Sequence, residues 1–173
     1  MKYNKAGETI ILILGVYWGY RMLRKEYTTT NDTAKAREID LLARTVYGEA
    51  RGETSTGQQA VMSTILNRVK KGGWYGATVE DVVLKPYQFS CWNAKTVGTT
   101  NKTELSNYNQ MINATVDSDF IFAYLHQLAT TALNEGLHDY SGGATHYHAK
   151  SIKPYWADRL TKTAEIGNHV FYV

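Results

Sequence analysis

The stretch LARTVYGEARGETSTGQQAVMSTILNRV, residues 42–69, decides the fold, because it reads as two helices separated by a glycine-rich turn. Apolar residues recur at helical spacing over residues 39–50, which predicts the first helix. Asp32 or Thr33 is its expected N-cap. The glycines of the GEARGE sequence weaken its far end, so we expect the helix to give way to a turn there.

The second helix is marked at both ends. Ser55, followed three residues later by Gln58, predicts a capping box at its start. An apolar stripe then recurs at helical spacing. The Lys-Lys-Gly-Gly sequence at residues 70–73 predicts the C-terminus, because cations and glycine favour that end of a helix.

The rest of the body reads as shorter elements. A short capped helix is expected at residues 78–84, and a long loop, aromatic first and polar later, at residues 86–103. Two further helices are expected over residues 104–116 and 119–134, and the tail after residue 141 reads as short strands and loops. We therefore predict an α+β fold, mainly α, in which one helical domain carries a small β element.

The N-terminal segment is a separate object. Residues 9–20, TIILILGVYWGY, are apolar on every side and have Lys or Arg on both flanks. Extended to residues 6–23, the run reaches the length that spans a bilayer core of about 30 Å. We predict a membrane anchor in residues 1–27, and we expect it to be uncleaved because no small-residue cleavage site follows closely. An amphipathic or core helix is the alternative. A polar linker over residues 28–36 and a catalytic body over residues 37–173 complete the predicted organisation.

Composition excludes several classes of protein. A chain of 173 residues with 43% hydrophobic and 20% charged residues is typical of one globular domain with a core. The net charge of +3 arises within residues 1–36, which hold six Lys or Arg and three Asp or Glu. The body carries no basic excess, so we expect no nucleic-acid partner. Cys91 is the only cysteine, so no intramolecular disulfide can form. We expect Cys91 to be a small buried residue.

Glu49 is the first candidate for chemistry. It lies seven residues after Leu42 and three after Val46, so it shares the buried face of the first helix. Burial among apolar groups favours the protonated form of a carboxyl, which suits a general acid. The alternative is a buried glutamate satisfied by Arg51 or by backbone donors. Glu53, one turn later, is expected to have a structural role near the start of the next helix.

Five motifs occur in an order and spacing that can be compared with a known family: DLLARTVYGEARGE, GQQAVMSTILNRV, QFSCW, GGATHYH and IGNHVFY. Together, over residues 39–172, they resemble the SleB/CwlJ-type cell wall hydrolases, the spore-cortex-lytic enzyme family that also occurs in phage lysins. The resemblance implies a lysozyme-like, lytic-transglycosylase-like fold, with the first glutamate of EARGE, Glu49, as the catalytic acid. The THYH sequence and a Thr/Asn-rich insertion near residues 95–103 depart from the family pattern and put the substrate contacts in question.

The resemblance also implies an activity that needs no cofactor: cleavage of the β-1,4 bond between MurNAc and GlcNAc in peptidoglycan. Protonated Glu49 would donate its proton to the glycosidic oxygen, and its carboxylate would then accept the proton of the MurNAc C6 hydroxyl, which closes a 1,6-anhydro ring. A two-carboxylate glycosidase needs a second Asp or Glu, and none stands out apart from Glu53. This favours ring closure over the hydrolysis of a muramidase. The expected setting is a phage enzyme for host lysis or wall penetration, possessing a membrane anchor and facing the periplasm or cell wall.

The expected substrate contacts stack on sugar rings or bond to them, and they come from the long loop and the tail. They are Gln88, Phe89, Tyr147, His148 and Trp156. Arg51 and Glu53 are expected to support Glu49. A purely structural role is the alternative for each of these residues.

Two other function classes are open. His146 and His148 face the same way if they lie on a strand, and with His169 they would form a zinc site for an amidase or peptidase. The motif lacks a nearby acidic ligand, so His169, like Asn67, is otherwise expected to be structural. A glycan-binding protein without activity is the remaining alternative.

Overall fold

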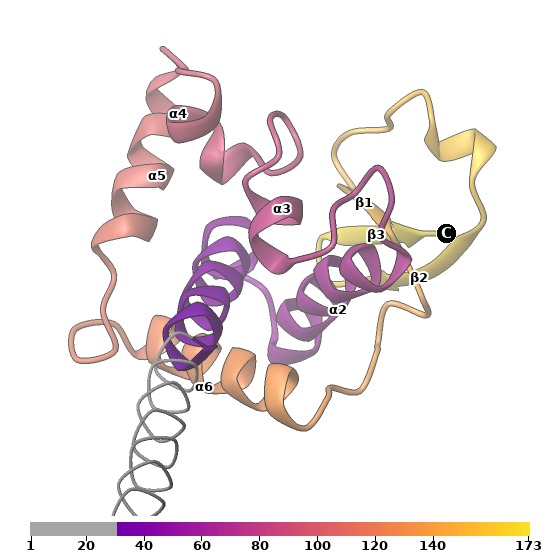
Figure 1. Ribbon diagram of the computed structural model, residues 1–173. Coiled ribbons are helices and arrows are strands. Elements are labelled where there is room, and N and C mark those ends of the chain that lie inside the picture. Colours follow the sequence, from indigo (N-terminus) through magenta and orange to yellow (C-terminus); the bar gives the residue numbers. More distant parts are fainter. Residues whose placement is uncertain (1–30) are drawn as a thin grey trace, which may run out of the picture. The chain divides into compact units, whose positions relative to one another are not determined.

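The computed structural model describes residues 31–173, which Figure 1 shows coloured along the sequence. The chain divides into two units, residues 1–37 and 38–173. Residues 31–50 are helical, so neither Asp32 nor Thr33 caps this helix, and the described part of the expected linker is helical rather than irregular. The expected anchor lies outside the described residues. Within residues 31–173, no helix is both long and apolar enough to cross a bilayer.

Helix α2 (Ser55–Lys71) follows after a short turn. Its N-cap is Thr54, whose side chain accepts a hydrogen bond from a backbone amide of the first turn. The predicted capping box between Ser55 and Gln58 is wrong, because the N-cap lies one residue earlier and the Gln58 side chain donates to the carbonyl of Arg51 at 3.4 Å. The C-terminus is confirmed: Gly72 has a φ of 62° and closes the helix with two backbone hydrogen bonds.

The aromatic stretch after α3 (Val79–Val83) is expected to be a loop but folds into helical turns, η1 (Ser90–Trp92) and α4 (Asn93–Thr96). Phe89 and Trp92 are only 2% and 1% exposed. Each buried ring contributes about 1.5–3 kcal/mol, which orders a segment that has few apolar residues after position 92.

Helices α5 (Lys102–Asn113) and α6 (Phe120–Asn134) are confirmed to within three residues at each end. Asp119 is the N-cap of α6 and accepts from the amide of Phe122 at 2.9 Å. Its other oxygen accepts from the hydroxyl of Tyr47 at 2.6 Å. This pair of bonds fixes α6 across the first helix, and Figure 1 shows α6 beneath the first helix and α2.

The tail forms a three-stranded antiparallel sheet in the order β1–β3–β2. The strands are β1 (His146–Ala149), β2 (Lys162–Ile166) and β3 (His169–Tyr172), and η2 (Ala157–Arg159) precedes β2. Tyr147 and Phe171 pair across β1 and β3 and face the main core. Tyr172 faces the other way, onto a small cluster that includes Trp156. Both faces of the sheet are therefore covered.

The end of the first helix lies between two groups of elements. Figure 1 shows α4 and α5 on one side of the central helices and the sheet on the other. Asn67 and Arg68 of α2 donate to the carbonyls of Ala144 and Thr145 at 3.1 and 2.7 Å. These bonds hold the start of β1 against α2, which confirms a structural role for Asn67 and fixes the position of Tyr147.

Candidate active site

Glu49 lies in the last turn of the first helix and is half-buried. Its Oε1 accepts from the hydroxyl of Ser90 at 3.2 Å and from the amide of Cys91 at 3.1 Å. Its Oε2 accepts from the hydroxyl of Tyr147 at 3.1 Å. The donors belong to η1 and β1, so two distant parts of the chain hold the carboxyl from both of its oxygens.

Gly48 allows η1 to approach the helix beside Glu49. A Cβ at this position would lie 2.5 Å from Cβ of Cys91 and 2.9 Å from its sulfur. The sequence suggested that this glycine weakens the end of the helix, but the helix continues to residue 50. The role of Gly48 is to provide space for η1. This close packing accompanies the hydrogen bond from the amide of Cys91 to the carboxyl.

The groups around Glu49 keep their protons. Burial, and then the negative charge of Glu49, raise the pKa of the Tyr147 hydroxyl well above its usual range. The same two causes raise the pKa of the Cys91 thiol. Tyr147 therefore remains a hydrogen-bond donor, and Cys91 is a buried, inert thiol rather than a nucleophile.

Glu53 is committed to the turn between β2 and β3. Its Oε2 accepts from the amide of Asn168 at 3.1 Å, and its Oε1 accepts from the Asn168 side chain at 3.0 Å. Gly167, with a φ of 56°, is required there because a Cβ would lie 1.8 Å from Oε2 of Glu53. These contacts hold the turn against the segment that follows Glu49.

His169 does not form an ion pair with this carboxylate. Its Nδ1 lies 3.7 Å from Oε1 of Glu53, which is beyond hydrogen-bond distance. This nitrogen has no hydrogen-bond partner among residues 31–173. Burial lowers the pKa of His169, so the ring is neutral near pH 7. The ring packs edge-on against Tyr147 at 5.2 Å between centroids.

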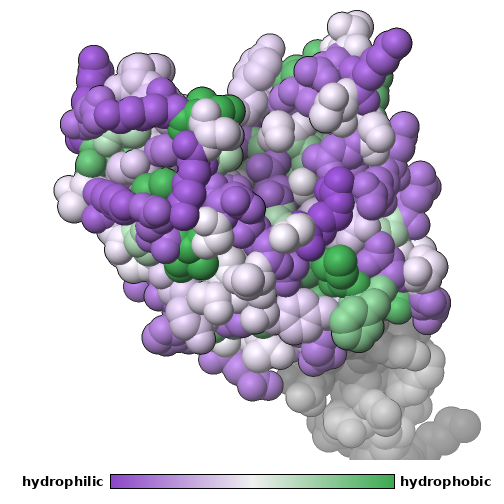
Figure 2. All heavy atoms as spheres, turned by 180° about the vertical axis from the view of Figure 1, so that it is seen from behind, coloured by the Kyte–Doolittle hydropathy of each residue, from purple (hydrophilic) through white to green (hydrophobic). Residues whose placement is uncertain are grey.

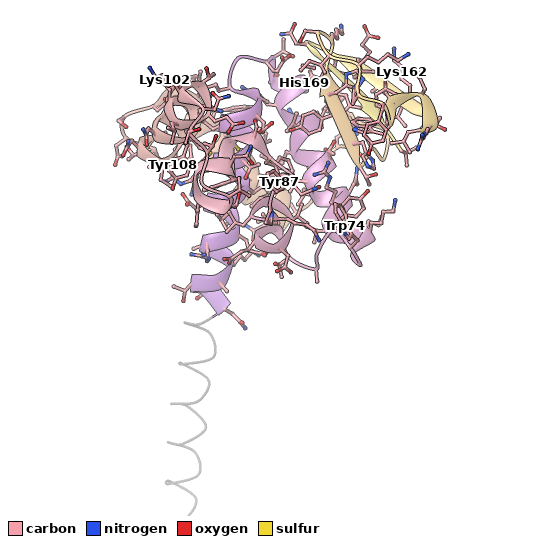
Figure 3. The ribbon with its side chains drawn as sticks, turned by 90° about the horizontal axis from the view of Figure 1, so that it is seen from above. Trp74, Tyr87, Lys102, Tyr108, Lys162 and His169 are labelled. Atoms are coloured by element: carbon pink, nitrogen blue, oxygen red, sulfur yellow. The ribbon has the colours of Figure 1, made fainter. Side chains whose placement is uncertain are left out.

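Two pockets share Gly48 and Arg51 in their linings, and Glu49 lines the second of them. The larger, about 500 Å³, lies on the α5 side and is lined by residues that include Gly48, Arg51, Ser90, Lys102 and Asn107. The other, about 390 Å³, lies on the sheet side and is lined by residues that include Gly48, Glu49, Arg51, Glu53 and His169. Figure 2 shows the surface hollowed between these two sides. Figure 3 shows Lys102 and His169 on opposite sides of the segment that follows the first helix.

Arg51 contacts α5 rather than Glu49. Its guanidinium donates to the Asn107 side chain, and the amide of that side chain donates to the carbonyl of Gly48 at 3.1 Å. The expected support of Glu49 by Arg51 is therefore indirect, because Arg51 ties the end of the first helix to α5. Asn107 has no sequence signal, since nothing near it in the chain indicates this contact.

Of the five expected substrate contacts, Tyr147 is the one that bonds Glu49, and none of the five lines the two pockets. Gln88 instead accepts a hydrogen bond from Arg68 at 3.5 Å. The ring of Phe89 is in the core, which corrects its expected role. His148 and Trp156 lie on the far face of the sheet, where His148 bonds the Tyr172 hydroxyl at 3.1 Å. Alternation along β1 separates them from Tyr147, so their expected contact with substrate at Glu49 is also corrected.

The same alternation divides the three histidines of the proposed zinc site. The rings of His146 and His148 contact Trp156, at 5.3 and 5.7 Å between centroids. His169 contacts Tyr147 on the opposite face. Within residues 31–173, no three His, Cys, Asp or Glu side chains are arranged to hold a metal ion.

Sequence comparisons find relatives of one kind. A family model described as Cell Wall Hydrolase matches residues 52–172. A spore cortex-lytic enzyme of Halalkalibacterium halodurans is 30% identical over 137 residues, which cover 78% of this chain and 34% of that protein. A spore cortex-lytic enzyme of Bacillus cereus is 45% identical over 53 residues, or 31% of this chain and 20% of the relative. The chain thus spans about a third or less of the length of these curated relatives.

Two solved structures share the fold. The catalytic domain of the germination-specific lytic transglycosylase SleB from Bacillus anthracis has a TM-score of 0.50 and 27% identity, and the match covers 79% of this chain and 93% of that one. The catalytic domain of the Bacillus cereus SleB protein has a TM-score of 0.50 and 28% identity, with 79% and 89% covered. The predicted helical body with a small β element is confirmed.

Proposed function

The chain belongs to the SleB/CwlJ-type cell wall hydrolase family, and we propose that it cleaves the β-1,4 bond between MurNAc and GlcNAc as a lytic transglycosylase. One observation carries this proposal. Glu49 is a half-buried carboxyl held by three hydrogen-bond donors; it lines the sheet-side pocket, and its neighbour Gly48 and its donor Ser90 line the α5-side pocket. A glycan strand that occupied both pockets would cross this carboxyl.

The reaction needs one group that first donates and then accepts a proton. Protonated Glu49 donates to the glycosidic oxygen as the bond from MurNAc C1 breaks and positive charge develops on the ring. The carboxylate then accepts the proton of the C6 hydroxyl, whose oxygen forms the new bond to C1. The products are a 1,6-anhydro-MurNAc end and a GlcNAc with a free 4-hydroxyl. Glu49 is protonated again, and no water is consumed.

The donors around Glu49 suit this cycle. After the first proton transfer, Tyr147, Ser90 and the amide of Cys91 donate to a full carboxylate, and hydrogen bonds to an ionised acceptor are the stronger kind. They also restrict the rotation of the carboxyl, so that it remains directed at the reacting bond.

Hydrolysis by a muramidase is the alternative, and the other carboxylates that line the pockets argue against it. The usual hydrolase requires a second carboxylate about 5–9.5 Å from the acid. Glu53 accepts two hydrogen bonds from Asn168, and Glu104 accepts one from the Asn93 side chain at 3.2 Å. Both carboxylates thus tie separate parts of the chain together, which favours a structural role for each.

A zinc-dependent amidase has less support, because the sheet separates His169 from His146 and His148. Incubation with EDTA should leave the activity unchanged. Loss of activity that returns on addition of Zn²⁺ would support the amidase instead.

Product analysis tests the proposal. Purified peptidoglycan is digested with the protein, and the soluble fragments are identified by mass spectrometry. We expect 1,6-anhydro-MurNAc ends, and none with the Glu49→Gln variant. Reducing MurNAc ends would make the protein a muramidase, while free stem peptides, or no turnover at all, would contradict cleavage of the glycan strand.

The setting is part of the proposal. The setting that we propose is a phage enzyme of host lysis or wall penetration, since the family also occurs in phage lysins, and the apolar run over residues 6–23 favours a membrane anchor. Fractionation of producing cells and of phage particles separates these settings. Recovery of the full chain in the soluble fraction would remove the anchor.

A further inference from the structure

We infer that the pocket on the α5 side binds the acidic substituent of MurNAc, namely the lactyl group and the first residues of its stem peptide. This inference rests on the proposed function, since it assigns one part of the same substrate to one side of Glu49. It adds an orientation: MurNAc of the cleaved bond lies toward α5, and GlcNAc lies toward the sheet.

The lining of this pocket is rich in hydrogen-bond donors: Arg51, Asn107 and Ser90 already donate within the protein, and Lys102 is exposed. Arg51 and Ser90 line it beside Glu49, and Lys102 and Asn107 line it from the first two turns of α5. Glu104 is the one carboxylate among the lining residues, and the Asn93 side chain already donates to it. Two cations against one bonded carboxylate favour an anionic ligand.

The pocket on the sheet side has the opposite character. Glu49 and Glu53 both line it, and Arg51 is its one cation, because burial keeps His169 neutral near pH 7. An anionic substituent there would meet two carboxyl groups at close range, which is unfavourable. A neutral sugar meets no such penalty.

The substrate has a matching asymmetry. Along a peptidoglycan strand, MurNAc carries a lactyl group and a stem peptide with free carboxylates, while GlcNAc carries neither. The α5-side pocket, at about 500 Å³, lies within the size range of small-ligand sites and exceeds what a lactyl group fills. The charge of the lining therefore places the peptide-bearing sugar on the α5 side, and the volume of that pocket permits it.

Lys102 gives the sharpest test, because it is exposed and its replacement does not disturb the core. The substrate is purified peptidoglycan, either untreated or with its carboxylates amidated by carbodiimide and ammonia. The enzymes are the full-length wild type, Lys102→Ala, and Lys70→Ala as the control. Lys70 is an exposed lysine of α2 that lines neither pocket. Its replacement by alanine changes the net charge by the same amount as Lys102→Ala but leaves the pockets intact.

We expect amidation to lower kcat/KM of the wild type about tenfold, as for the loss of one charge-assisted hydrogen bond. Lys102→Ala should show a similar loss on untreated substrate and little further loss on amidated substrate, because the two changes remove the same contact. Lys70→Ala should behave as the wild type does on both substrates.

The inference is overturned if amidation does not affect the wild type, if the two losses add fully, or if Lys70→Ala matches Lys102→Ala. The last result would indicate general attraction of an anionic polymer. Failure of the proposed function is distinguishable, since the wild type would then cleave neither substrate. A circular-dichroism melt of each variant shows whether the fold is retained.

Discussion

The hydroxyl of Tyr147 lies 3.1 Å from Oε2 of Glu49 and donates to it, although 98 positions separate the two residues in the chain. Asn67 and Arg68 make this possible, because they hold the start of β1 against α2. Local helix geometry thus places Glu49, the carboxyl that we propose as catalytic. The hydrogen bonds that hold β1 against α2 place its donor, Tyr147.

Tyr147→Phe removes this donor and little else. We expect kcat to fall at least tenfold with KM almost unchanged, because a hydrogen bond to a charged group contributes about 1.5–3 kcal/mol. Initial rates of peptidoglycan clearance measure both constants. Tyr172→Phe is the matched control, since its hydroxyl bonds His148 on the other face of the sheet. Equal losses in the two variants would indicate a structural effect instead.

Gly48→Ala should destabilise the fold by about 1–3 kcal/mol, the usual range for overpacking a tight contact. The added Cβ would lie 2.5 Å from Cβ of Cys91 and would push η1 away from Glu49. Urea unfolding followed by circular dichroism measures the change. At Gly52, four residues later, nothing lies within 4 Å of an added Cβ, so Gly52→Ala should keep wild-type stability. Equal stability of the two variants would refute the close-packing role of Gly48.

Glu53→Gln separates a structural carboxylate from a catalytic one. The amide would present a donor to one of the two donors of Asn168, so we expect a loss of about 1–3 kcal/mol in stability. At a temperature where the variant is folded, it should keep most of its activity, whereas Glu49→Gln should have none. An inactive but folded Glu53→Gln would make Glu53 a second catalytic carboxylate and favour hydrolysis.

Acid should unfold the protein through two aspartates. The Tyr47 hydrogen bond lowers the pKa of Asp119, and for Asp139 burial acts upward but hydrogen bonds from Ser141 and Asn67 lower the pKa overall. A carboxyl whose pKa is lower in the folded state stabilises above its unfolded value, about 3.9, and that contribution is lost as the pH falls through the folded pKa. The free energy of unfolding should therefore drop below about pH 4.

The variants Asp119→Asn and Asp139→Asn check this pH dependence. Each should be less stable than the wild type at pH 7, and each should show a shallower loss of stability below about pH 4. Urea unfolding across this range measures both quantities. A variant whose stability falls as steeply as that of the wild type would show that its aspartate is not responsible.

Features encoded within a few residues were predictable. The short capped helix expected at residues 78–84 is present, with a capping box between Thr78 and Asp81. Gly72 ends α2 where the glycine pair indicated. The prediction of a long loop at residues 86–103 was wrong, because aromatic rings of this segment are buried against other elements and order it. The indole of Trp92, for example, donates to the Thr45 hydroxyl at 2.9 Å. Local patterns do not carry that information.

By itself, the sequence determined the two central helices, the family and the position of Glu49 on the buried face, because helical periodicity and caps depend on residues within one or two turns. Only the tertiary structure decided which side chains surround Glu49. On β1, a side chain faces one way or the other according to which face of the sheet packs on α2. That packing brought Tyr147 to the carboxyl and left His148 and Trp156 on the far side.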